Sequence, residues 1–137
     1  MKNRINNMAK RILIAACGTL LAASSAFAHH SFAAEFDANK PIQLKGKLTG
    51  AELVNPHGWL HLDVARPDGK TVNWSCEMGG ANALYRRGWK KEDLPVGKVL
   101  IVEGFLAKDG SATMNAVSIT FEDGRKLFAG SSVGGNQ

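Results

Sequence analysis

Residues 58–78 read GWLHLDVARPDGKTVNWSCEM, two alternating segments separated by a short turn. Apolar and polar side chains alternate over Gly58–Ala65 and again over Lys70–Met78, which predicts two β-strands that each turn one face toward a core. Between them, Pro67-Asp68-Gly69 matches a three-residue hairpin loop, in which a type I turn is followed by a glycine in the left-handed region. The segment is therefore predicted to form a β-hairpin.

The length of the loop also predicts which residues of the two strands face each other. A three-residue loop pairs Arg66 with Lys70, and every further pair follows from that one. The inward pairs are then Val64 with Val72, Leu62 with Trp74, and Leu60 with Cys76. The outward pairs are Asp63 with Asn73, His61 with Ser75, and Trp59 with Glu77. Pattern and turn chemistry agree on one register, because the inward partners are all apolar.

Three more strands and one helix are predicted around this hairpin. The strands are expected at Ile42–Val54 with a bend at Gly50, at Lys98–Ala107, and at Ala112–Phe121 with Val117, Ile119 and Phe121 inward. The helix is expected at Ala83–Arg87, with Asn82 as its N-cap and Gly88 as its stop. This order is that of an OB-fold, a five-stranded Greek-key barrel that usually binds ligands on strands two and three. We therefore predict an all-β, OB-like barrel with one short helix between strands three and four.

Residues 1–28 have the features of a cleaved secretory signal. Four basic residues and no acidic one precede an apolar run over residues 12–23, and Ala26-Phe27-Ala28 has the small-x-small pattern of a cleavage site. The run is too short for a good membrane span, which needs about 20 residues. A lipoprotein box ending at Cys17 is the alternative, although apolar sequence continues past it. We expect an exported, periplasmic protein with one domain over residues 29–129 and a flexible tail over residues 130–137.

Removing the signal changes what the composition implies. Four of the 17 basic residues lie in residues 1–28, so the remaining 13 nearly balance the 12 acidic residues. Little net charge is left to attract nucleic acid, and export also argues against that partner. Cys76 is the only cysteine after residue 28, which excludes an intrachain disulfide. Its inward position predicts a buried, unreactive thiol.

Several short motifs of the chain occur together in one known family. They are His29-His30-Ser31-Phe32, Asn55-Pro56-His57, Trp74 with Glu77, Arg86-Arg87-Gly88-Trp89, and the turns Asp109-Gly110 and Asp123-Gly124-Arg125. Together they resemble DUF6152, a family of small exported bacterial proteins, over nearly all of residues 29–128. The resemblance implies export and a single compact domain, and it implies no substrate or mechanism.

The expected mature N-terminus carries the donor groups of a metal site. Cleavage leaves His29 first, so that its α-amine and imidazole can bind one ion, and His30 follows. With a further histidine these donors would resemble the T-shaped copper site called the histidine brace, because such nitrogens suit Cu(II). His57 and His61 lie about 13 Å apart in an extended strand, so they cannot both join. We hypothesise a copper site of His29 with His30 or His57, the alternative being a solvated chain end.

The outward face of the hairpin is a second candidate site. Trp59, His61 and Glu77, with Asn55 nearby, could hold a small polar or cationic ligand by stacking and by charge. The alternative is an ordinary half-exposed cross-strand pair, which stabilises a sheet by less than about 1 kcal/mol.

A basic cluster is the third candidate. Arg86 and Arg87 lie close in sequence to Lys90 and Lys91, and together they could dock an acidic envelope protein or lipid headgroups. The alternative is a solvated helix end, where cations are favoured by the helix dipole.

The sequence contains no Ser-His-Asp spacing, no glycine-rich phosphate loop and no paired catalytic carboxylates. We therefore predict a non-enzymatic binding module, for a copper ion first and, as the alternative, for a protein or small ligand.

Overall fold

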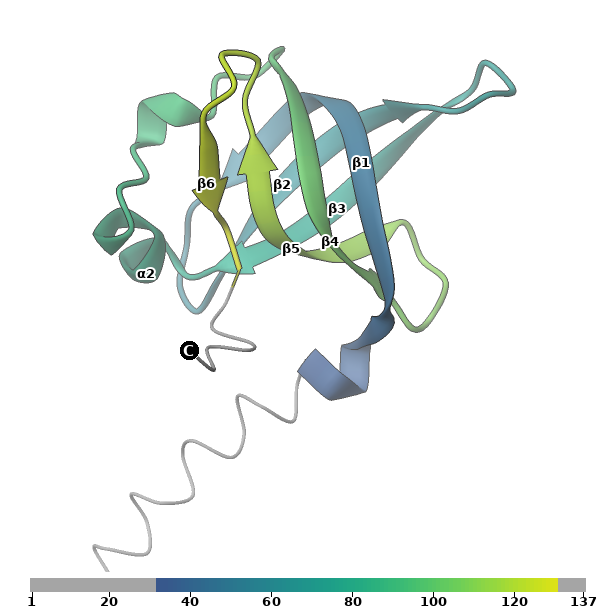
Figure 1. The fold of residues 1–137 in the computed structure, drawn as a ribbon, viewed down its shortest axis with the longest axis horizontal. Coiled ribbons are helices and arrows are strands. Elements are labelled where there is room, and N and C mark those ends of the chain that lie inside the picture. Colours follow the sequence, from purple (N-terminus) through teal and green to yellow (C-terminus); the bar gives the residue numbers. More distant parts are fainter. Residues whose placement is uncertain (1–31, 131–137) are drawn as a thin grey trace, which may run out of the picture. The chain divides into compact units, whose positions relative to one another are not determined.

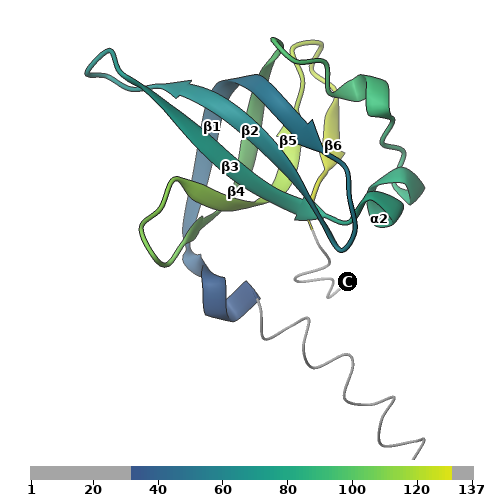
Figure 2. The same ribbon diagram turned by 180° about the vertical axis from the view of Figure 1, so that it is seen from behind.

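The computed structural model describes residues 32–130, which are built mainly from strands (Figures 1 and 2). The described strands are β1 (Phe36–Glu52), β2 (His57–Ala65), β3 (Thr71–Gly79), β4 (Val99–Ala107), β5 (Thr113–Thr120) and β6 (Lys126–Phe128). Two short helical elements, α2 (Ala81–Arg86) and η1 (Lys91–Asp93), separate β3 from β4. Residues 32–35 are also helical, and the compact unit that holds the strands begins at Glu35.

None of the helices in residues 32–130 is long and apolar enough to cross a bilayer. The predicted signal segment lies outside the described residues, and so do residues 131–137 of the predicted tail.

Five of the strands close into a ring. Hydrogen bonds join the strands in the order β3-β2-β1-β4-β5-β6, and all neighbours in this order are antiparallel. A further, parallel pairing of β3 with β5 closes the ring of β1 to β5. This closing seam is short, because it contains only the pairs Ser75 with Thr113, Cys76 with Met114, and Glu77 with Asn115. Strand β6 lies beside the end of β5.

The predicted hairpin is confirmed in turn and register. All six predicted strand pairs occur between β2 and β3. The backbone N–H of Arg66 donates to the carbonyl oxygen of Lys70 at 2.8 Å, and that of Gly69 donates to Arg66 at 3.0 Å. Gly69 has a φ of 79°, the left-handed conformation that the loop requires. Figure 1 shows that the tip of this hairpin projects beyond the ring.

The inward side of the hairpin forms much of the core. Leu60, Leu62, Cys76 and Met78 are completely buried. Trp74 is partly buried and packs against the same cluster. The alternation of the sequence therefore predicted the core side of β2 and β3 correctly.

Two irregularities shift the pattern of other strands. The expected bend at Gly50 is confirmed, because the pairing of β1 with β2 shifts between Leu48 and Gly50. The predicted inward side of the fifth strand is wrong in part, since β5 carries an extra residue, Val117, opposite the step from Glu103 to Gly104. This bulge reverses the alternation before Val117. Met114 and Ala116 therefore join Ile119 in the core, while Val117 is only half-buried.

The predicted helix exists, but its N-cap is different. Helix α2 begins after Gly80 rather than after Asn82, and no side chain of its own caps it. The cap comes from the β1–β2 loop instead: the backbone N–H of Asn82 donates to Oδ1 of Asn55 at 3.2 Å, and that of Ala81 donates to the carbonyl of Val54 at 3.0 Å. This contact between distant segments holds the loop before β2 against the end of β3, next to His57.

Candidate functional site

A buried carboxyl and a histidine meet where β2 begins and β3 ends. In the pairing of β2 with β3, Trp59 is opposite Glu77 and His57 is opposite Gly79. The side chains of His57 and Glu77 therefore lie at the same end of the hairpin. Nδ1 of His57 lies 3.1 Å from Oε1 of Glu77. Glu77 is only 8% exposed although the alternation places it on the outward side of the hairpin. We call His57, Glu77 and their neighbours Asn115 and Glu35 the His57–Glu77 corner.

The surroundings of Glu77 disfavour the ionised form of its carboxyl group. Burial raises the pKa of the Glu77 carboxyl; the nearby His57 opposes this shift, and the charge of Glu35 adds to it. The side-chain amide of Asn115 hydrogen-bonds the carboxyl and favours the ionised form. Asn115 is itself 2% exposed and sits opposite Glu77 across the closing seam. One imidazole and one buried amide thus lie against the Glu77 carboxyl, and the charge of Glu35 acts on it.

The contact between His57 and Glu77 is close but poorly aligned. The two atoms are within ion-pair distance, yet Nδ1 is buried and has no hydrogen-bond partner in the described part of the chain. Nδ1 therefore faces an acceptor without being satisfied by it.

Glu35 is the last of the helical residues that precede β1, and its charge acts on Glu77. The backbone N–H of Lys108 donates to the carbonyl oxygen of Glu35 at 2.8 Å, and the next residue, Phe36, pairs with Ala107 of β4. These contacts fix Glu35 beside the β4–β5 turn, close enough to Glu77 for their charges to interact. The sequence reasoning missed both Glu35 and Asn115. A polar asparagine within the apolar run of β5 was the one available signal.

The rest of the outward face is satisfied internally. Oδ1 of Asp63 and Oγ1 of Thr49 both accept from the amide of Asn73, at 2.8 and 3.2 Å. His61 lies along the same face, with Nε2 3.8 Å from Oε1 of Glu52 and Nδ1 3.4 Å from Oγ of Ser75. Trp59 is half-buried, at the end nearest the corner. Of the predicted set, Trp59 and Glu77 are cross-strand partners, whereas His61 lies two residues along β2 beside Ser75 and Glu52.

The predicted basic cluster is divided by the fold. Nη1 of Arg87 donates to the carbonyl of Gly130 at 2.8 Å, and its guanidinium lies 4.6 Å above the ring of Phe128. Nε1 of Trp89 donates to the carbonyl of Phe128 at 2.8 Å, and Trp89 is buried. Arg86 and Arg87 are both exposed overall, and Trp89 is the buried member of this segment. Arg87 and Trp89 thus hold the chain around β6 against α2.

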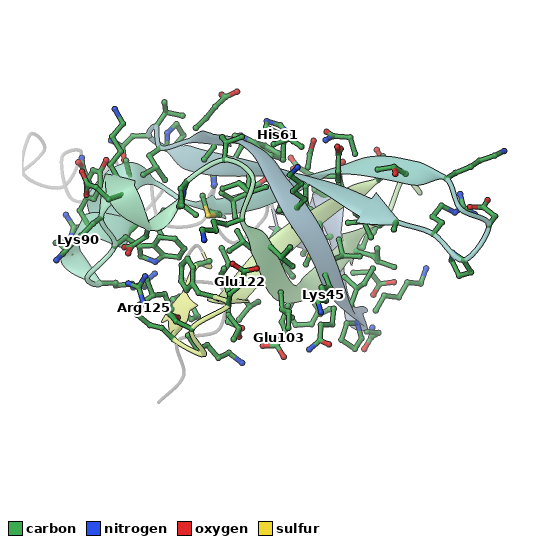
Figure 3. All side chains as sticks on the ribbon, turned by 90° about the horizontal axis from the view of Figure 1, so that it is seen from above. Lys45, His61, Lys90, Glu103, Glu122 and Arg125 are labelled. Carbon is green, nitrogen blue, oxygen red and sulfur yellow. The ribbon has the colours of Figure 1, made fainter. Side chains whose placement is uncertain are left out.

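A groove on another side of the ring contains an anchored carboxylate. Its volume is about 580 Å³, and it is lined by Pro41, Ile42, Gln43, Glu103, Gly104, Phe105, Val117, Ser118 and Lys126. Hydrogen bonds from Lys126, Ser118 and Gln43 lower the pKa of Glu103 to about 2. In Figure 3, Glu103 and His61 project from opposite sides of the molecule. Gln43, Ser118 and Lys126 thus all direct a donor at the Glu103 carboxylate inside the groove.

The described residues hold no complete metal site. Within residues 32–130 no three histidine, cysteine, aspartate or glutamate side chains are placed to hold an ion. Of the predicted copper ligands, only His57 is among the described residues, since His29 and His30 precede them. Cys76 is buried as predicted, and its burial raises the pKa of the thiol to about 12.

Comparison with known proteins gives one match. The sequence profile described as "Family of unknown function (DUF6152)" matches residues 18–116. No curated protein and no solved structure matches the chain. The motifs quoted above and this match over most of the sequence lead to one conclusion: the chain belongs to the DUF6152 family.

Proposed function

We propose that the protein is an exported, non-enzymatic binding module of the periplasm, built on an OB-like barrel. Support for the barrel comes from the connectivity of the ring, in which β1-β2-β3 form a meander and β5 returns to pair with β3. The helix between β3 and β4 occupies the same place in the chain as in OB-folds. The signal-like residues 1–28 support export.

The ligand that this module takes is a copper ion, bound through the mature N-terminal His29, with His30 or His57 as the candidate for the further ligand. The observation that carries this proposal is the His57–Glu77 corner, where a half-exposed imidazole lies 3.1 Å from a buried carboxyl group. Surplus negative charge in a partly buried place favours a bound cation. Imidazole and amine nitrogens select Cu(II) among the common divalent ions.

The number of residues between His30 and Glu35 sets an upper limit on their separation. Glu35, whose charge acts on Glu77, follows His30 by only five residues. An extended chain covers at most about 3.6 Å per residue, so His30 is tethered within about 18 Å of Glu35. His29 supplies its α-amine and ring, and His30 or His57 supplies the further nitrogen. His61, four residues along β2, belongs to the outward face instead.

Intact mass of the exported protein, titrated with Cu(II), tests the proposal. We expect a chain that begins at His29 and carries one copper ion. One additional residue before His29 removes the free amine from its position and abolishes binding. Where His57 is the further ligand, His57→Ala weakens binding strongly, whereas His61→Ala, the matched control in the same strand, leaves it unchanged. A processed chain without a copper adduct contradicts the proposal, and equal effects of the two histidine variants exclude His57 as the further ligand.

The corner also favours a second candidate function, the binding of a small cationic ligand. Trp59 is half-buried and pairs with Glu77, so an aromatic face and a carboxyl group lie side by side. A ligand of this kind binds independently of the chain's first residue. The variant with one additional residue before His29 separates the two functions, because it loses copper and keeps the organic ligand.

A further inference from the structure

Exposed apolar and aromatic side chains lie at one end of the molecule. Within residues 32–130, the large side chains of this kind that are exposed are Val54, Tyr85, Val96 and Phe128. Tyr85 belongs to α2, and Val96 follows η1. The loop with Val54 contacts α2, because the N–H of Ala81 donates to the carbonyl of Val54 at 3.0 Å. Figures 1 and 2 show α2 and β6 at the end of the molecule opposite the tip of the β2–β3 hairpin.

The same end also carries a surplus of positive charge. Three exposed basic residues end α2 or adjoin η1, namely Arg86, Lys90 and Lys91. In residues 32–130 no carboxylate lies within ion-pair distance of these three side chains. Of the acidic residues that follow them, Asp93 is engaged by Arg125 at 2.7 Å, which leaves Glu92 to offset one of the three charges. In Figure 3, Lys90 projects from this end of the molecule.

The combination of the two features is typical of a membrane-surface contact. Basic side chains attract anionic headgroups, and apolar side chains enter the boundary between the headgroups and the acyl chains. Tyrosine is enriched at this boundary, because its ring is apolar and its hydroxyl group is polar. A soluble acidic peptide would neutralise the cations but would leave the exposed apolar side chains in water, whereas an anionic bilayer accommodates both.

We propose that this end of the molecule docks on an anionic phospholipid membrane. We call the docking residues the α2–η1 surface, and they are Val54, Tyr85, Arg86, Lys90, Lys91 and Val96. The inference goes beyond the proposed function, since it needs neither the copper ion nor the first residue of the mature chain. Each Lys or Arg near an anionic membrane contributes about fivefold in affinity, so the three cations together contribute about 100-fold.

Sedimentation with lipid vesicles tests the proposal on the wild-type protein. The processed chain is used, because residues 1–28 are themselves basic and apolar. We expect binding to vesicles of phosphatidylglycerol and about 100-fold weaker binding to vesicles of phosphatidylcholine. Binding to the anionic vesicles should fall strongly in 1 M salt, where the Debye length is about 3 Å. Equal binding to the two kinds of vesicle, or binding to neither, overturns the inference.

Two triple variants then test whether the α2–η1 surface makes the contact. The first neutralises the cations of the surface and consists of Arg86→Gln, Lys90→Gln and Lys91→Gln. The control removes the same charge from exposed positions elsewhere and consists of Lys45→Gln, Arg66→Gln and Lys70→Gln. We expect the first to lose about 100-fold in affinity for phosphatidylglycerol vesicles and the control to bind nearly as well as the wild type. Equal losses overturn the inference, because net charge rather than this surface would then determine binding. The wild-type comparison decides the matter where a triple variant does not fold.

Two further measurements distinguish a bilayer from a soluble acidic partner. Tyr85→Ser keeps every charge, and we expect it to weaken binding to phosphatidylglycerol vesicles severalfold by removing an inserted ring. Soluble polyglutamate supplies negative charge without an apolar phase, so we expect it to displace little of the protein from the vesicles. Unchanged affinity of Tyr85→Ser, or full displacement by polyglutamate, identifies an acidic protein as the partner and overturns the inference.

Discussion

Gly104 of β4 lies opposite the bulge of β5, where a side chain has no room. A Cβ atom built on this residue would lie 1.9 Å from the carbonyl oxygen of Asn115 and 2.8 Å from Cε of Met114. Optimal contacts between heavy atoms are about 3.5–4.0 Å, so one backbone segment must move by more than about 1 Å. Overpacking in a core costs about 1–3 kcal/mol, and a rigid backbone neighbour puts Gly104→Ala at the upper end.

Gly50→Ala is the matched control, because Gly50 also lies at a bulge. Its Cβ would meet only the His61 side chain, at 3.5 and 4.0 Å, which is ordinary contact. Without strain, replacing glycine by alanine stabilises a protein by about 0.4–1 kcal/mol through the unfolded state. We expect Gly50→Ala to be neutral or slightly stabilising.

Thermal unfolding followed by circular dichroism measures both variants. In a domain of this size 1 kcal/mol shifts Tm by about 4–8 °C, so a loss of about 3 kcal/mol lowers Tm by about 12–24 °C. Gly50→Ala should leave Tm within a few degrees of the wild type. Equal Tm values for the two alanine variants would refute the reasoning, because they would show that the β4–β5 bulge can absorb a methyl group.

Three further predictions concern other residues. Cys76 should not react with Ellman's reagent in the folded protein and should react on unfolding, since the thiol is buried with a pKa of about 12; fast reaction under native conditions contradicts its burial. Lys126→Met should raise the pKa of Glu103 from about 2 toward its ordinary 4.5, as followed by carboxyl NMR. Because the pKa of Glu103 is lower in the folded protein than its ordinary value, the contact with Lys126 stabilises the fold above about pH 4.5, and this stabilisation is lost as the pH falls toward 2. An unchanged titration of Glu103 in Lys126→Met would exclude the pairing of these two residues. Asn55→Ala removes the acceptor for the N–H of Asn82 and should cost about 1 kcal/mol in urea unfolding, whereas no change means that water replaces the cap.

The hairpin was predictable because its determinants are local. The turn Pro67-Asp68-Gly69 and the alternation of its flanking strands specify one register, and the structure has that register. The phase of β5 was not predictable in the same way. Its bulge at Val117 lies opposite Gly104 and depends on the close approach of two backbones, which the sequence of β5 alone does not encode.

The candidate site was predictable only in part. The motifs and the turn before β2 indicated His57, and the register placed Glu77 on the same end of the hairpin. Alternation alone makes Glu77 an outward, solvated residue. Its burial beside Asn115 is a consequence of ring closure, which brings together residues 38 positions apart in the sequence. The pairing of β1 with β4 positions Glu35, and the residues paired next to it are even farther apart in the sequence.

Ring closure and the candidate site use the same carboxyl group. The seam between β3 and β5 has three parallel pairs, and Glu77 with Asn115 is the last of them. A buried carboxylate contributes little to the stability of a closed ring, because the free energy of its desolvation often exceeds that of its contacts. Replacing a buried ionic group by apolar residues is accordingly often neutral or stabilising. At this corner the carboxylate has one amide and one misaligned imidazole as neighbours. A copper ion bound through His57, as one form of the proposal has it, would offset the cost of the buried charge and so stabilise the closed seam, and by linkage the closed seam would bind the ion more tightly. The burial of Glu77 at the seam is thus the feature of the fold that a bound cation would account for.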